Sequence, residues 1–254
     1  MTGARGRLGG QVVRLLTGRD GVEVVGLTRA VADYDDRPAL TGALAGVDTL
    51  VLVSSDGEAE RVLQHHLNVA DAAAANGVVH VVALSSVDAD LDSPFCYARV
   101  NALTEGALVD RGLAVTAVRA SIFTEFFQTL LDGAMVDGEL RVPAEEARVA
   151  LVAREDVGRC LAACALLPPD AAYDVTGPAA LDLTAIAAAR GAAYVPVSEA
   201  EFASAVALRE TPWWAYAYTS MFASIREHRW DAVTDAVERL TGRPPTRAIS
   251  GQPG

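Results

Sequence analysis

Four short apolar runs separated by helical segments constrain the fold of this chain more than any other feature. The runs lie at residues 22–28, 49–53, 78–84 and 113–118. A helix-like segment lies between each run and the next, at 37–44, 58–76 and 97–111. Alternation of this kind is typical of a parallel sheet with helices on both faces. The sequence therefore predicts an α/β fold with a doubly wound parallel sheet.

A glycine-rich turn precedes the first helix-like segment. Gly3, Gly6 and Gly9 follow a G-x-x-G-x-x-G spacing, and an apolar stripe that includes Leu8 and Val12 follows at once. Glycines at this spacing let the backbone approach a pyrophosphate, and the helix N-terminus holds the anion. The pattern predicts a Rossmann-type dinucleotide site, and the alternative is a purely structural turn.

The first strand of such a sheet is missing or truncated in this sequence. In the usual strand order 3-2-1-4-5-6 that strand lies in the middle of the sheet and leads into the glycine-rich turn. We therefore expect an in-frame upstream stretch of about five to eight residues, rich in Val and Ile, that raises stability and cofactor affinity. The alternative is a damaged sheet, and the short connection between Thr28 and Asp33 also leaves no room for an ordinary crossover.

Length and composition limit the possible domain organisation and the possible binding partners. The 254 residues suit one nucleotide-binding domain at 1–176, with 120–147 contributing to the cleft, and a small substrate-facing lobe at 177–254. The net charge of −12 argues against nucleic acid and anionic membranes as partners. No apolar run reaches the ~18 residues of a membrane span, and no secretory signal is present, so we expect a cytoplasmic monomer or homodimer.

The cationic residues are all arginine, and the chain contains no lysine. A Schiff-base lysine, a P-loop lysine and a lysine-assisted tyrosine are therefore excluded. The three cysteines and four histidines lack metal-ligand spacing, so no metal site is expected. Cys160 and Cys164 share one helix face and are interpreted as small core residues.

Motifs along nearly the whole chain resemble one family, the NmrA-like atypical short-chain dehydrogenases, and in particular its NAD(P)H:quinone oxidoreductase subgroup. The motifs that carry the resemblance are Thr2–Gly9, Arg29, Asp33–Asp36, Val53–Ser55, Asn68-Val69, Leu84–Ser86, Thr104-Glu105, Val118-Arg119, Phe123–Phe127, Gly138–Leu140, Glu155–Val157, Thr176–Pro178, Val233–Asp235 and Leu240–Pro245.

The resemblance implies a Rossmann domain, a nicotinamide cofactor and two-electron reduction of quinones or similar flat acceptors. It equally implies an alternative, because some relatives bind NAD(P) without turnover and act as redox-responsive regulators. The chain departs from the family pattern in three places. The first strand is missing, the segment after Arg29 is short, and the helix near 185–191 leads directly into Tyr194. A decayed paralogue is therefore a further alternative.

The candidate cofactor contacts follow the ends of the predicted strands. Arg29 stands where an NAD enzyme carries an acid for the ribose 2′-hydroxyl, which favours NADPH, and the alternative is a solvated surface residue. Serines after two strands either contact the cofactor or cap helices, and the family resemblance implies a loop at 121–123 over the nicotinamide. The full set is Gly3, Arg5, Gly6, Arg7, Leu8, Gly9, Arg29, Ser54, Ser55, Ser85, Ser121, Ile122 and Phe123.

Tyr97 and Asn101 occupy the region where many short-chain dehydrogenases carry Tyr-x-x-x-Lys, and they are the candidate catalytic pair. Asn101 is neutral, so Tyr97 is expected to keep a phenol pKa of about 10 and to be a poor base. Quinone reduction tolerates this, because the acceptor takes a hydride first and a proton from water. Aromatic residues at 123, 127 and 213–222 either face a flat substrate or pack the small lobe.

Overall fold

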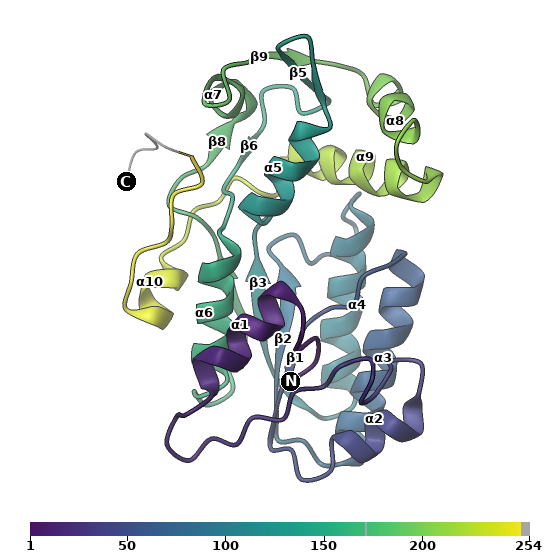
Figure 1. Ribbon diagram of the computed structural model, residues 1–254, viewed down its shortest axis with the longest axis vertical. Coiled ribbons are helices and arrows are strands. Elements are labelled where there is room, and N and C mark those ends of the chain that lie inside the picture. Colours follow the sequence, from purple (N-terminus) through teal and green to yellow (C-terminus); the bar gives the residue numbers. More distant parts are fainter. Residues whose placement is uncertain (171, 250–254) are drawn as a thin grey trace.

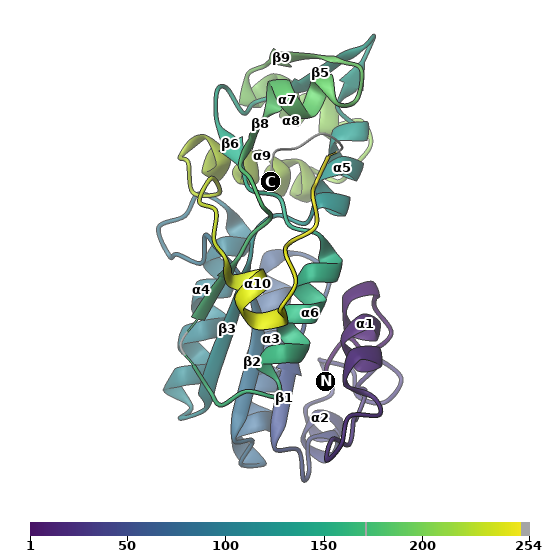
Figure 2. The same cartoon turned by 90° about the vertical axis from the view of Figure 1, so that its left-hand side faces the viewer.

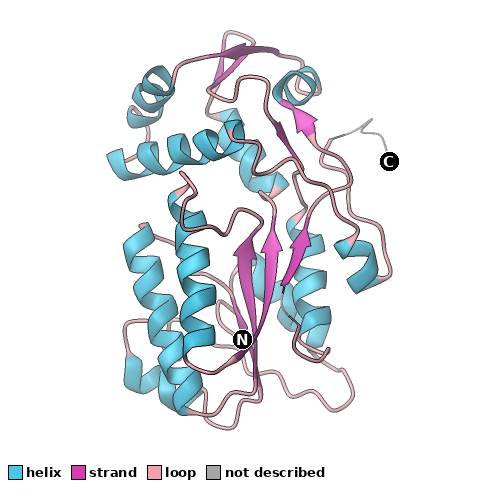
Figure 3. Ribbon diagram, turned by 180° about the vertical axis from the view of Figure 1, so that it is seen from behind, coloured by secondary structure: helices cyan, strands magenta, loops and turns pink. Residues whose placement is uncertain are grey.

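Four parallel strands form the central sheet of the computed structural model, which describes residues 1–170 and 172–249 (Figures 1 and 3). They are β1 (Thr49–Leu52), β2 (His80–Ser86), β3 (Ala114–Ala120) and β7 (Ala172–Val175), in the order β1-β2-β3-β7. In the register, Leu50 pairs with Val81 and Val82 pairs with Thr116. These apolar runs are buried on both faces, as a parallel sheet requires.

Helices cover both faces of this sheet. On one face lie α2 (Arg37–Ala43), α3 (Ala59–Ala75) and α4 (Cys96–Asp110), and on the other lie α1 (Arg7–Leu16), α6 (Arg154–Cys164) and α10 (Ala236–Thr241). Figure 2 shows α6 between α1 and α10. Successive residues of β1 serve the two faces, because Leu50 belongs to the first core and Val51 to the second. The predicted doubly wound α/β fold is confirmed, and Cys160 and Cys164 are buried core residues as expected.

The segment 22–28 is extended but is not a strand, so the strand predicted there is wrong. Its neighbours are the first residues of the chain: Leu27 N–H donates to Met1 O at 2.8 Å, and Ala4 N–H donates to Leu27 O at 3.1 Å. Thr2 N–H in turn donates to Val51 O at 3.0 Å. Residues 1–4 thus lie between segment 22–28 and β1, and this contact is too short to form a continuous ladder.

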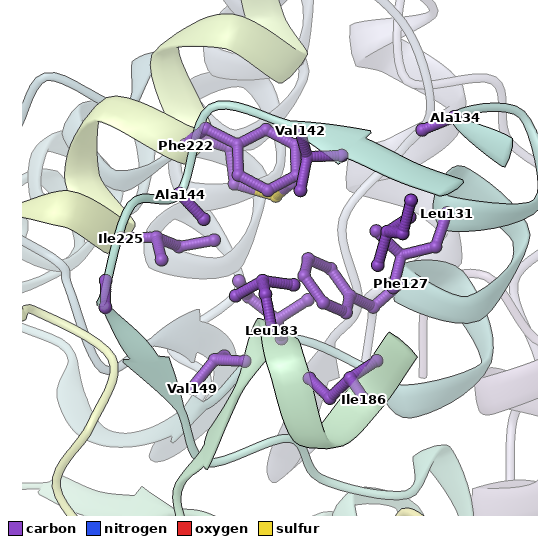
Figure 4. Packing of buried hydrophobic residues seen from close by; sticks show 14 of the residues in the cluster. Phe127, Leu131, Ala134, Val142, Ala144, Val149, Leu183, Ile186, Phe222 and Ile225 are labelled. Atoms are coloured by element: carbon purple, nitrogen blue, oxygen red, sulfur yellow. The ribbon is translucent and has the colours of Figure 1, made fainter. Parts of the chain in front are cut away.

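A smaller lobe lies beyond the carboxyl ends of the strands (Figure 1). It contains a mixed sheet β4-β5-β9 and an antiparallel pair β6-β8. Its elements are α5 (Thr124–Asp132), β4 (Met135–Val136), β5 (Glu139–Val142), β6 (Arg148–Val149), β8 (Leu181–Asp182), α7 (Leu183–Ala188), β9 (Ala193–Pro196), α8 (Glu199–Ala207) and α9 (Pro212–Arg226). Phe127, Leu183 and Phe222 meet in its core (Figure 4). The division of the chain after residue 176 stays a prediction.

Several chain segments pass between the sheet and this lobe, and we call four of them the neck: 121–124, 150–153, 175–177 and 230–234. They are bonded to one another, since Ser121 N–H donates to Val175 O at 2.9 Å and Val152 N–H to Ile122 O at 3.0 Å. A Cβ on Gly177 would lie 2.0 Å from Leu151 O, so two of the segments approach as closely as backbones can. Among residues 1–170 and 172–249, no helix is long and apolar enough to cross a bilayer.

Candidate active site

The glycine-rich loop lines a pocket of about 820 Å³ at the carboxyl end of β1. Ligand pockets usually enclose roughly 300–1,000 Å³, so a nucleotide-sized ligand fits. Nine residues that the sequence predicts as cofactor contacts line this pocket: Gly3, Arg5, Gly6, Arg7, Leu8, Gly9, Arg29, Ser54 and Ser55. The other four, Ser85, Ser121, Ile122 and Phe123, lie outside its wall.

The loop closes on itself so tightly that its glycines are required. Gly3 has a φ of +62°, which glycine adopts without strain. A Cβ on Gly9 would lie 2.1 Å from Gly3 O, and a Cβ on Gly6 would lie 3.2 Å from the same atom. The backbone of the loop therefore presents itself to the pocket without intervening side chains.

Helix α1 points its open N-terminus into this pocket. The N-cap residue is Gly6, which provides no side-chain cap. The first N–H groups of a helix have no acceptor within the helix, and together with the helix dipole they favour an anion. Arg5 and Arg7 line the same wall. This end of the pocket thus suits a pyrophosphate.

The far end of the pocket is formed by the chain after segment 22–28. Arg29 lies here with 89% of its side chain exposed, 3.6 Å from Asp33. Arg154, the first residue of α6, adds a further cation to the wall, and sequence reasoning missed it. Its only sequence signal is its position directly before the acidic first turn of α6.

Two buried histidines hold the serines that follow β1. His66 Nε2 lies 3.1 Å from Ser54 Oγ, and His65 Nδ1 lies 2.8 Å from Ser55 Oγ. The Thr104 hydroxyl donates to the Val100 carbonyl at 2.7 Å, so its oxygen accepts from His66 Nδ1 at 2.8 Å. His66 Nδ1 therefore carries the hydrogen of that bond, and Ser54 Oγ also donates to Ser55 O at 3.1 Å. Sequence reasoning excluded the histidines as metal ligands but missed these contacts.

Burial lowers the pKa of His66 from its ordinary 6.5 to about 4, and the neighbouring His65 contributes to the lowering. Above pH 6.5 the imidazole is neutral in both the folded and the unfolded chain. Between pH 6.5 and 4 the unfolded chain binds a proton that the folded chain does not, so the free energy of unfolding falls by about 3 kcal/mol. Urea titrations at pH 7, 5 and 4 measure this loss.

His66→Gln should flatten that pH dependence, whereas His228→Gln, which changes an exposed histidine, should leave it intact. An unchanged slope in His66→Gln would show that other groups cause the acid sensitivity.

The serines after β2 are directed toward other partners. Ser85 Oγ donates to Glu105, which also accepts two hydrogen bonds from Arg119, at 3.0 and 2.6 Å. Ser86 Oγ accepts from Asn101 Nδ2 at 3.0 Å. The structure thus brings Asn101 to Ser86 rather than to Tyr97, and it brings Ser85 to an ion pair rather than to the glycine-loop pocket.

The loop after β3 lies in the neck. Ser121 is 3% exposed, and its Oγ has no hydrogen-bond partner within residues 1–170 and 172–249. Ile122 packs into the core of the small lobe. Phe123 lies beside the pocket, because the Arg154 guanidinium is 5.5 Å from its ring centroid. A buried hydroxyl without a partner is uncommon in a folded protein.

Tyr97 belongs to an aromatic cluster at the start of α4 and α9. Its ring centroid lies 5.6 Å from that of Trp213 and 6.4 Å from that of Trp214. Its hydroxyl donates to Gly57 O, just beyond Asp56 in the pocket wall. Burial raises the Tyr97 pKa well above the phenol value, so our expectation of about 10 is wrong because it ignored desolvation. The conclusion that Tyr97 is a poor base is strengthened.

The residues present fit a dinucleotide cofactor on three counts. The glycine loop exposes its backbone to the pocket, the N-terminus of α1 lacks a side-chain cap, and the pocket is large enough for a nucleotide. Four arginines line the pocket wall against a single carboxylate, that of Asp56. Such a surface favours an anionic ligand.

Comparison with known proteins agrees with this geometry, although no family model matches the chain. Quinone oxidoreductase 2 of Escherichia coli K12 is 34% identical over 192 residues, which cover 71% of this chain and 65% of that relative. A (4-alkanoyl-5-oxo-2,5-dihydrofuran-3-yl)methyl phosphate reductase of Streptomyces griseus is 34% identical over 71% of this chain and 68% of its own length. The chain belongs to the NmrA-like atypical short-chain dehydrogenase family.

This NmrA-like protein also resembles a solved structure over nearly its whole length. The crystal structure of an E. coli NADPH-dependent quinone oxidoreductase complexed with NADPH matches with a TM-score of 0.88 and 28% identity, over 97% of this chain and 95% of that one. The relatives found are NAD(P)H-dependent reductases, so the chain belongs to an NAD(P)H-dependent oxidoreductase family.

Proposed function

We propose that this NmrA-like protein is an NADPH-dependent reductase of quinone-like or aromatic carbonyl acceptors. The proposal rests on one loop that borders both the cofactor-sized pocket and the aromatic cluster. Ser54–Asp56 line the cofactor-sized pocket, and the next residue, Gly57, accepts the Tyr97 hydroxyl of the aromatic cluster. A nicotinamide and a flat acceptor can meet at such a junction.

Preference for NADPH is supported by the charges around the pocket. Arg29 follows segment 22–28 at the position where NAD enzymes carry an acid, and Arg5 lies in the glycine loop. Guanidinium groups bind a phosphate through charge-assisted and often bidentate hydrogen bonds. We propose that the 2′-phosphate is held by Arg29, with a contribution from Arg5.

When bound, the cofactor supplies the hydride for the reduction. The residues of the chain contribute position and environment. The α1 N-terminus and the glycine loop hold the pyrophosphate, Ser54 and Ser55 are oriented by their histidines, and the aromatic rings of the cluster stack against the acceptor. Tyr97 stays protonated and bonded to Gly57 O, so the proton comes from water.

The test combines NADPH binding, followed by tryptophan fluorescence, with NADPH oxidation in the presence of a panel of quinones and aromatic carbonyls. Turnover with at least one acceptor is the expected result. Binding without turnover would favour a redox-responsive regulator. Absence of binding would favour a decayed paralogue.

We expect Tyr97→Phe to lower quinone reduction by less than tenfold, because a buried phenol of raised pKa does not act as a base. Alcohol oxidation should be undetectable in the unmodified protein, since that reaction needs a base for the hydroxyl proton. Steady-state kcat/KM for both variants measures the effect.

Tyr97→Leu, which also removes the ring, should cost more than Tyr97→Phe if the ring itself contacts the acceptor. A thousandfold loss on removing the hydroxyl alone would assign Tyr97 a catalytic proton transfer and contradict the mechanism above.

A further inference from the structure

Ser55, His65 and Asp35 form a continuous hydrogen-bonded chain beside the pocket. Ser55 Oγ lies 2.8 Å from His65 Nδ1, and His65 Nε2 lies 3.1 Å from Asp35 Oδ1. A serine next to an imidazole that is oriented by a carboxylate is the arrangement that activates a hydroxyl as a nucleophile.

The imidazole of His65 is held firmly in this orientation. Its side chain is only 6% exposed and stacks on Tyr34, with ring centroids 5.3 Å apart and an interplanar angle of 17°. Arg61 is also close: its Nε lies 3.4 Å from His65 Nε2, and its NH2 group binds the second oxygen of Asp35 at 3.0 Å. Asp35 is thereby fixed by two partners, and its pKa is lowered first by the hydrogen bond from Arg61.

Ser55 occupies a suitable place in the fold for a nucleophile. It lies in the turn between β1 and α3, at the carboxyl end of a parallel strand, and it lines the pocket. In α/β-hydrolases the nucleophile sits on a strand-to-helix turn, and the next residue donates its N–H to the oxyanion. Here the next residues are Asp56 and Gly57, and no hydrogen bond within the described chain is donated by either backbone N–H.

We propose that Ser55 is an activated nucleophile and that the protein, without nucleotide in its pocket, hydrolyses small activated esters. This activity is separate from the proposed reduction and needs no cofactor.

The steps balance with the groups present. Ser55 Oγ attacks the ester carbonyl while His65 Nδ1 takes its proton, and Asp35 holds the Nε2–H of the resulting imidazolium. The C–O bond of the ester breaks, and the alkoxide or phenoxide leaves with the proton from Nδ1. Water then attacks the acyl-serine, again giving a proton to His65, and the carboxylic acid leaves as the proton returns to Ser55 Oγ.

The test is hydrolysis of p-nitrophenyl acetate by purified full-length protein without added nucleotide. Ser55→Ala and His65→Gln should each lower the enzyme-dependent rate by about tenfold or more. Phenylmethylsulfonyl fluoride should label a single serine, and peptide mass spectrometry should locate the label on Ser55. Circular dichroism and thermal melts check that each variant is folded.

His228→Gln is the matched control, because a free imidazole hydrolyses this ester and His228 is an exposed histidine. Its rate should equal that of the unmodified protein. The proposal is overturned if Ser55→Ala keeps the full rate, if the label lies on another serine, or if His228→Gln removes the activity. Should His65→Gln fail to fold, Ser55→Ala and the labelling site decide the question alone.

Discussion

Gly9→Ala should weaken NADPH binding by about a hundredfold, which corresponds to about 2.7 kcal/mol. A Cβ at this position would lie 2.1 Å from Gly3 O and 2.7 Å from the Gly3 carbonyl carbon, so the loop and the start of α1 must move apart. Overpacking of this kind also costs about 1–3 kcal/mol of stability. Fluorescence titration with NADPH measures the first effect, and urea unfolding measures the second.

Gly106→Ala provides the control for that substitution. Gly106 lies in the middle of α4 and is exposed, and a Cβ there would meet no atom within 4 Å. We expect unchanged NADPH affinity and a gain of about 0.5–1 kcal/mol in stability, because alanine loses less backbone entropy in a helix than glycine does. Full NADPH affinity in Gly9→Ala would mean that the loop does not carry the pyrophosphate.

Arg29→Ala should weaken NADPH binding by about tenfold and NADH binding by less than about twofold. A charge-assisted hydrogen bond contributes about 1.5–3 kcal/mol, and we take the lower end because the Arg29 side chain is 89% exposed and therefore screened. The difference between the two cofactors isolates the 2′-phosphate, which NADH lacks. Binding titrations at low and high salt should show the NADPH effect shrinking as salt rises.

Arg19→Ala removes an exposed arginine that is not part of the pocket wall, so it reports the effect of net charge alone. It should change both affinities equally and little. Equal losses of NADPH and NADH in Arg29→Ala would contradict its assignment to the 2′-phosphate, and attention would then pass to Arg5 and Arg154.

The central sheet could be predicted because its signal is local. The runs that became β1, β2 and β3 are mostly apolar, and each is followed by a helix. Segment 22–28 has the same local pattern, yet it is not a strand, because its ladder depends on residues 1–4 beside it. The short strands β4, β6 and β8 have two residues each, which is too few for any periodicity to appear.

In the candidate site, too, local features could be predicted and contacts between distant residues could not. The glycine loop is contiguous in the sequence, and its three glycines line one pocket. The roles of Ser55 and Ser85 depend on residues distant in the chain: Ser55 meets His65, which in turn meets Asp35, and Ser85 meets Glu105. No spacing rule connects such positions. The raised pKa of Tyr97 likewise depends on burial against the small lobe, which a single sequence does not reveal.

The neck has a mechanical consequence for how this cleft can open. A lobe joined by only one or two chain segments can rotate about a hinge, because a few backbone torsions absorb the motion. Here the four neck segments run side by side. Backbone hydrogen bonds donated by Thr124, Val152 and Ser121 join three of them, and Ala150 N–H donates to Trp230 O of the fourth. Rotation of the lobe would have to break several of these bonds at once. Substrate entry and product release should therefore depend on small movements of side chains and of the cleft rim, and the two lobes should unfold as one cooperative unit.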